Sequence, residues 1–297
     1  MGEGGTKERQ PRGGRVADAA RAGRLLIPAL VRDRAGSRSD EAVAAVATNP
    51  ARLYLREHLR GAIDLLLPRA CVSCERLLSR VETGLVCSLC WARLPLLPSP
   101  QCPRCGHPIS TGACRWCDLL PPFVRAVRSV CWMPVDPASS IVHALKYEGW
   151  AAVASEIAER MSRLAWPRDV VDERVALVPI PLASARKRQR GYNQSALIAH
   201  GIARRWRLPV WEDVVVRSRE TSSQTRLTPE QRLDNVAGSF RIHRRPDGLT
   251  GAHLIVVDDV VTTAATLNTC ATALYEAGAR IISYVTFGRA HASGDRL

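Results

Sequence analysis

Eight of the ten cysteines in this chain fall into four pairs of the form Cys-x-x-Cys. A Cys-x-x-Cys turn directs two thiolates at one point, and two such turns complete a tetrahedral Zn²⁺ site. Twelve residues separate the first two pairs, and eight separate the last two. This spacing favours two sequential four-cysteine sites, with interleaved ligation or one site beside a decayed partner as the alternatives. The predicted zinc ligands are Cys71, Cys74, Cys87, Cys90, Cys102, Cys105, Cys114 and Cys117.

The predicted zinc is structural, because the segment that carries the pairs holds few apolar residues and needs metal binding to fold. No surplus ligand set marks an open catalytic position. Chelation is expected to unfold this module and to leave the rest of the chain largely intact. The remaining two cysteines, Cys131 and Cys270, stand in apolar contexts and are predicted to be buried core residues.

A second chemical signal lies in residues 253–267, where an apolar run ends in two carboxylates and a hydroxyl-rich loop leads into a predicted helix. Ligands of open α/β sheets bind outside the carboxyl ends of the strands. The N–H groups of a helix N-terminus attract phosphate, threonine hydroxyls donate further hydrogen bonds, and carboxylates accept them from ribose hydroxyls. The pattern predicts a ribose-5-phosphate site on Asp258, Asp259, Val260, Val261, Thr262, Thr263, Ala264, Ala265 and Thr266.

The elements that must position these groups follow from hydrophobic periodicity. From Val124 onward, strand-like apolar runs alternate with helical segments, which argues for an α/β fold with a mostly parallel sheet flanked by helices. The predicted strands are 124–133, 175–180, 253–257 and 281–287, and the predicted helices are 138–145, 150–164, 193–206 and 266–277.

The chain divides into four predicted parts. Residues 1–40 are a disordered basic extension, with an over-called start codon as the alternative. Residues 41–69 are a helical lead-in, 70–120 the zinc module with a proline-rich hinge at 94–100, and 124–292 the α/β domain.

The combination of motifs resembles the competence-protein ComF family, which joins a zinc-ribbon-like module to a type I phosphoribosyltransferase domain. The segment from Arg190 to Gln194 (Arg-Gly-Tyr-Asn-Gln) matches a family motif, and the stretch around Asp258 resembles the 5-phosphoribosyl-1-pyrophosphate (PRPP) motif. Further matches are Val178-Pro179-Ile180-Pro181, Leu145-Lys146-Tyr147, Gln224, Arg232 and Asn235. The resemblance covers residues 65–287.

This resemblance implies a division of labour within the site. Asp258 and Asp259 would contact the ribose of PRPP, and residues 262–266 would hold its 5′-phosphate. The turn after Pro181 would face pyrophosphate and Mg²⁺, with Arg186, Arg188 and Arg190 nearby, and residues 217–235 would form a mobile loop. Ala264 replaces a family glycine; if this position has positive φ, alanine is strained by on the order of 1 kcal/mol.

The net charge of +14 indicates polyanionic partners, although the Arg-rich composition can also reflect codon bias. Residues 186–207 hold seven Lys or Arg side chains with Tyr192 and Trp206 between them, a composition suited to single-stranded DNA. The resemblance implies that the protein binds PRPP and acts in DNA uptake. It also implies single-stranded DNA and DNA-uptake machinery proteins as partners. The alternative is an inactive single-stranded-DNA-binding or adaptor protein on the same scaffold. The short apolar runs predict a cytoplasmic protein without membrane insertion.

Overall fold

The computed structural model describes residues 68–109, 114–218 and 239–291. The predicted extension at 1–40, the predicted lead-in at 41–69 except for its last two residues, and the loop residues Gln224, Arg232 and Asn235 lie outside these ranges. The described elements, in chain order, are α3 (Ser88–Ala92), a 3-10 helix η1 (Arg115–Leu119), β1 (Val124–Met133), α4 (Ala138–Tyr147), α5 (Val153–Ser162), α6 (Arg168–Glu173), β2 (Arg174–Pro179), α7 (Ser184–Arg190), α8 (Gln194–Trp206), β3 (Val215–Arg217), β4 (Phe240–Ile242), β5 (His253–Val261), α10 (Ala265–Glu276) and β6 (Ile281–Ala290).

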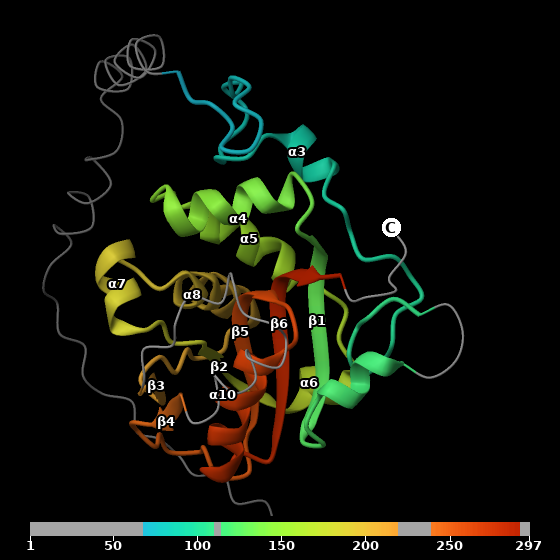
Figure 1. Cartoon of the computed structure of the whole chain (residues 1–297), viewed down its shortest axis with the longest axis vertical. Helices are drawn as coiled ribbons and strands as arrows, with labels where there is room; N and C mark the ends of the chain where they lie inside the picture. The colour runs from blue at the N-terminus through green and yellow to red at the C-terminus, as the bar shows by residue number, and fades with distance from the viewer. Residues whose placement is uncertain (1–67, 110–113, 219–238, 292–297) are drawn as a thin grey trace, which may run out of the picture. The chain divides into compact units, whose positions relative to one another are not determined.

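A four-stranded parallel sheet in the order β1-β6-β5-β2 forms the centre, as the alternating pattern predicts (Figure 1). The central strands are buried on both faces because helices cover each side. Along β5, Ile255 and Val257 belong to the core shared with α4, α5 and α8, while Leu254 and Val256 belong to the core shared with α10. Cys131 and Cys270 are both buried, as predicted.

All four predicted strands and all four predicted helices of the α/β domain are present, with ends that differ by a few residues. The pattern misses α6, α7 and the small antiparallel pair β3–β4, because short elements carry little periodicity. Helix α7 buries none of its side chains and ends at Gly191, whose φ of 82° closes a helix readily. This exposed basic helix follows β2 directly and therefore lies at the ligand-binding edge of the sheet.

Candidate phosphate-binding site and metal centres

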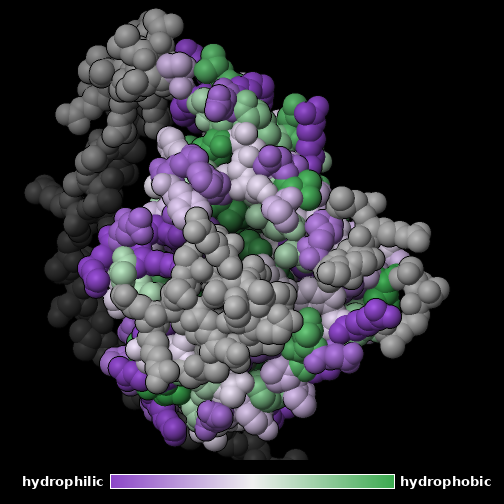
Figure 2. All heavy atoms as spheres, viewed as in Figure 1, coloured by the Kyte–Doolittle hydropathy of each residue, from purple (hydrophilic) through white to green (hydrophobic). Residues whose placement is uncertain are grey.

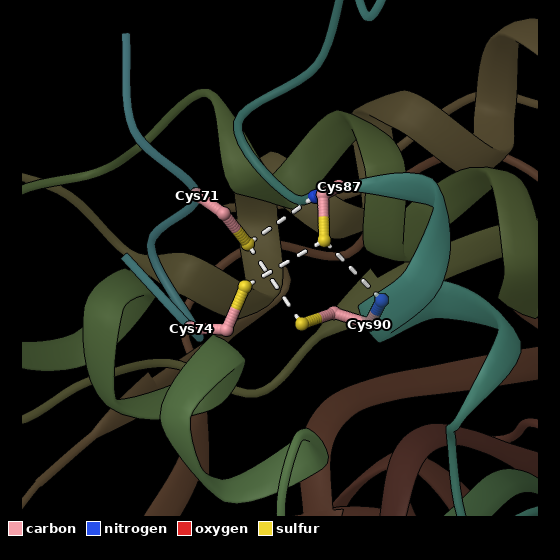
Figure 3. Close-up of side chains that lie close together, drawn as sticks. All are labelled: Cys71, Cys74, Cys87 and Cys90. Carbon is pink, nitrogen blue, oxygen red and sulfur yellow. Dashed lines mark hydrogen bonds between the residues drawn. The ribbon is translucent and has the colours of Figure 1, made fainter. Parts of the chain in front are cut away.

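The first group of cysteines comes together from two turns of chain that are distant in sequence. The Sγ atoms of Cys71, Cys74, Cys87 and Cys90 all lie within 4.8 Å of one another and point to a common centre (Figure 3). Sγ of Cys71 is 3.9 Å from that of Cys90, and Sγ of Cys74 is 3.7 Å from that of Cys87. The backbone N–H of Cys87 donates to Sγ of Cys71, which stabilises a thiolate.

The second group has the same construction. The Sγ atoms of Cys102, Cys105, Cys114 and Cys117 again lie within 4.8 Å of one another. Four sulfurs at Zn–S distances of about 2.3 Å fit such spacings, and four cysteines leave no open coordination position. Both groups therefore fit structural zinc, and the sequential pairing is the one that the structure places together. Among the described residues, these are the two clusters of three or more metal-ligating side chains.

Each cysteine group packs against a different face of the sheet. Cys71, Cys87 and Cys90 share the hydrophobic core of α4, α5 and α8, whereas Cys102 and Cys105 share the core of α10. The module is therefore part of the main core.

Polar contacts reinforce this attachment. On α5, the carboxylate of Glu156 accepts hydrogen bonds from Trp91 Nε1 and from the N–H of Leu85. On the other side, the buried guanidinium of Arg289 on β6 donates to the carbonyl oxygen of Cys105 and lies over the ring of Trp116.

The carboxyl end of β5 opens on a pocket of about 950 Å³. The walls come from the start of α10, from α7, from the C-terminus of α4 and from Arg217 of β3. Of the predicted phosphate-binding residues, all except Thr263 line the pocket. The first N–H groups of α10 have no partner within the helix and point toward its N-terminus, which makes this wall attractive to a phosphate.

The two carboxylates at the floor of the pocket have different partners. Both oxygens of Asp259 are engaged, because Oδ1 lies 2.8 Å from Lys146 Nζ and Oδ2 accepts a hydrogen bond from Gln194 Nε2. Oδ1 of Asp258 accepts hydrogen bonds from the hydroxyl of Ser195 and from the backbone N–H of Asp259.

These surroundings shift the pKa values of Asp258 and of Lys146. Burial, reinforced by the neighbouring charge of Asp259, raises the pKa of Asp258 to about 7, although Lys146 and the Ser195 hydroxyl act in the opposite direction. Burial lowers the pKa of Lys146, but the attraction of Asp259 and Asp258 together with the hydrogen bond to Asp259 gives a net upward shift. The lysine therefore stays charged and neutralises Asp259, while Asp258 is poised to exchange a proton near neutral pH.

The position of Ala264 resolves the alternative that the sequence leaves open. Ala264 is the N-cap of α10 and has φ 61° and ψ 2°, in the left-handed region. An L-residue with a Cβ atom is disfavoured there, so alanine strains the loop where glycine does not. Ala264 is buried and lines the pocket.

The three predicted arginines are not equivalent. Arg186 and Arg190 lie one turn apart on α7 and both line the pocket. Arg188 is exposed and is not among the residues that line the pocket. Hydrophilic side chains gather over α7 in the space-filling view (Figure 2). The helix therefore presents one basic face to the pocket and another to solvent.

The two aromatic residues predicted to interleave with this basic segment are occupied by protein contacts. The hydroxyl of Tyr192 donates to the carbonyl oxygen of Leu145. The ring of Trp206 lies under the guanidinium of Arg174, and its Nε1 donates to the carbonyl oxygen of Ser162. These contacts tie both residues to the protein, which sequence spacing alone does not reveal.

The sequence analysis places Lys146 and Gln194 in family motifs but does not predict that they, with Ser195, contact the acidic pair. One signal was available, since the chain has only three lysines among its 42 basic residues. A lysine in so arginine-rich a chain stands out. The segment that carries Gln194 and Ser195 is placed by Asn193, which caps α8 and also donates to the carbonyl oxygen of Ile180.

Comparison with known families defines the class of protein. A family model described as a double zinc ribbon domain matches residues 62–120. A second, the phosphoribosyl transferase domain, matches residues 193–296. The chain is thus a double zinc ribbon joined to a phosphoribosyltransferase-type α/β domain.

Full-length relatives narrow this class further. The DNA utilization protein YhgH of Escherichia coli is 31% identical over 229 residues, covering 73% of this chain and 96% of the relative. Competence protein F of Haemophilus influenzae is 26% identical, covering 74% and 96%. Competence protein ComFC of Bacillus subtilis is 28% identical, covering 65% and 79%. The chain belongs to this family of ComF and YhgH proteins, as its motifs indicate.

Among solved structures, a hypoxanthine phosphoribosyltransferase of Staphylococcus aureus aligns at 13% identity with a TM-score of 0.28, covering 50% of this chain and 69% of that one. In the described part of the chain, no helix is both long and apolar enough to span a membrane.

Proposed function

We propose that the pocket binds the ribose 5-phosphate part of PRPP or of a related phosphorylated sugar. One observation carries the proposal: the acidic pair and the start of α10 line the same pocket. Two arginines of α7 lie in the wall of that pocket. The 5′-phosphate would meet the N–H groups of α10 and the hydroxyls of Thr262 and Thr266. The ribose hydroxyls would donate to Asp258, because both oxygens of Asp259 already contact Lys146 and Gln194.

The pyrophosphate of PRPP would face Arg186 and Arg190. Guanidinium groups match phosphate oxygens well and remain charged at all working pH values. Mg²⁺ is usually held by one or two carboxylates together with substrate phosphates. Asp258 fits that donor set better than Asp259, whose two oxygens already contact Lys146 and Gln194. The ion would supply charge neutralisation on the pyrophosphate. The side chains would position the ligand, which is the main contribution expected of a phosphoribosyltransferase scaffold.

We further propose that this site serves DNA utilisation, the role for which the Escherichia coli relative is named. A second candidate is an inactive DNA-binding or adaptor protein on the same scaffold. Two observations favour that candidate: both oxygens of Asp259 are engaged within the protein, and Ala264 strains the phosphate loop. The two candidates share the pocket but differ in whether PRPP is bound.

Calorimetric titration of the full chain with PRPP·Mg²⁺ distinguishes them. Binding is expected, and Asp258→Asn should weaken it by about 1.5–3 kcal/mol, the range for a hydrogen bond to a charged group. Asp247→Asn is the matched control, because this exposed aspartate lies outside the pocket. Absence of binding in both the native chain and an Ala264→Gly variant would favour the second candidate.

A further inference from the structure

The proposed ribose-phosphate site does not account for the wall of the pocket that α4 builds. Tyr147 is the last residue of that helix and lines the pocket together with Gly149. Tyr147 is 69% exposed, so most of its ring meets solvent. A volume of about 950 Å³ lies near the upper end of the range for small-molecule sites, which leaves space beyond a ribose phosphate.

The ring has a defined place relative to the acidic pair. Its neighbour in the chain, Lys146, reaches the carboxylate of Asp259 with Nζ 2.8 Å from Oδ1. The backbone at Tyr147 therefore lies about the length of a lysine side chain from the acidic pair. In a nucleotide, the base is bonded to C1 of the same ribose, next to the hydroxyl-bearing C2. A base on that sugar would project from the floor of the pocket within reach of Tyr147.

The surroundings of the ring suit a planar ligand. The guanidinium carbon of Arg190 lies 5.4 Å from the centroid of the Tyr147 ring, and Arg190 itself donates to the side-chain oxygen of Gln194. His143, one turn earlier on α4, lies 5.0 Å from the same ring at an angle of 43° and supports it from the helix side. Aromatic rings and guanidinium planes are the two surfaces on which proteins stack bases.

We propose that Tyr147, with Arg190 beside it, is a stacking platform for the base of a nucleotide. The ligand class is a ribose 5-phosphate that carries a purine or pyrimidine on C1. This inference rests on the proposed function, because the sugar and phosphate must bind as described above for the base to reach the ring.

The test compares two ligands that share the sugar phosphate and differ in the base. The affinities of adenosine 5′-monophosphate and ribose 5-phosphate are measured by calorimetry on the full chain and on three variants. In the native chain, the nucleotide should bind about tenfold more tightly or better, the effect of stacking one base. Tyr147→Leu should reduce this ratio to near one without changing the affinity for ribose 5-phosphate. Tyr147→Phe should preserve the ratio, because it keeps the ring.

Tyr275→Leu is the matched control, since Tyr275 is a partly exposed tyrosine that stacks on Phe123 and lies outside the pocket. It should leave the ratio unchanged. If ribose 5-phosphate binds but the ratio is near one in the native chain, or survives in Tyr147→Leu, the stacking inference is wrong and the proposed function stands. If ribose 5-phosphate does not bind the native chain, the proposed function fails and this inference fails with it.

Discussion

The Nζ atom of Lys146 lies 2.8 Å from Oδ1 of Asp259, which ties the last turn of α4 to the carboxyl end of β5. Asp259 is 4% exposed, so its negative charge needs this partner to remain in the protein interior. The same lysine partly offsets the burial of Asp258. One cation thus pairs with Asp259 and acts electrostatically on Asp258, at the junction of two elements that are more than 100 residues apart in the sequence.

Lys146→Gln is expected to destabilise the protein, because it leaves the Asp259 carboxylate buried without a counter-charge. The free energy of unfolding should fall by up to about 3 kcal/mol, the lower end of the range for breaking a buried pair, since the lysine is partly exposed. Combining it with Asp259→Asn should cost less than the sum of the two single changes. Urea denaturation of the four proteins measures this coupling, and strict additivity would contradict the pairing.

The raised pKa of Asp258 predicts a pH dependence of stability. Between about pH 4 and about pH 7 the folded protein holds a proton that the unfolded chain releases, so this contribution is full at the acidic end and is lost as the pH rises through 7. Thermal unfolding of the native chain and of Asp258→Asn, measured across this range, should diverge accordingly. Asp247→Asn should follow the native profile.

Ligand affinity should show the opposite trend with pH. Ribose hydroxyls donate hydrogen bonds, so the ionised form of Asp258 is the better acceptor. Affinity for PRPP·Mg²⁺ should therefore rise as the pH increases through about 7, and Asp258→Asn should flatten this dependence. Titrations at several pH values in buffers of matched ionic strength provide the measurement. An equally steep profile in the variant would assign the dependence to another group.

Ala264→Gly should stabilise the protein by up to about 1 kcal/mol, because glycine adopts the observed φ of 61° without strain. Loss of one buried methyl group offsets part of the gain. Affinity for PRPP should be unchanged or stronger. Ala265→Gly, the first residue of α10, is the contrasting variant and should destabilise, because glycine loses more backbone freedom in a helix. Chemical denaturation of both variants gives the comparison.

The chain should bind about two Zn²⁺, one for each cysteine group. Cys74→Ser and Cys117→Ser should each lose one zinc, whereas Cys270→Ala, a change in the core, should retain both. Loss of both metals from either serine variant would contradict two independent four-cysteine sites. Metal analysis of the purified proteins measures the ratio.

Removal of zinc by a chelator should lower the melting temperature of the α/β domain as well as that of the zinc module. From the sequence we expect a module that unfolds independently, but both cysteine groups share side-chain packing with the sheet. Near-UV circular dichroism during chelation would report the loss of that packing, and an unchanged α/β signal would restore the sequence-based expectation.

Much of this architecture could be read from the sequence, because long apolar runs and paired cysteines are strong local signals. Strand β1 has its predicted limits, Val124–Met133, and the cysteine groups assemble in their sequential pairing. The partners of Asp259 could not be read in this way, because Lys146 and Gln194 reach it from other elements and only tertiary packing brings them there. The protein contacts of Tyr192 and Trp206 could not be read for the same reason: composition identifies an aromatic residue but not what packs against it.

The last prediction concerns single-stranded DNA and the two faces of α7. Arg188 is exposed, whereas Arg186 lines the pocket, so the two side chains separate a surface contact from a small-ligand contact. DNA binding should weaken steeply with salt, because each neutralised phosphate releases counterions. Arg188→Ala should reduce the slope of log affinity against log salt by about 0.7, the value for one phosphate contact on a single strand, and leave PRPP affinity unchanged. Arg186→Ala should weaken PRPP binding.

Removal of residues 1–40 should weaken DNA binding only modestly. If that truncation abolishes DNA binding while Arg188→Ala leaves the slope intact, the basic extension alone contacts DNA and α7 does not.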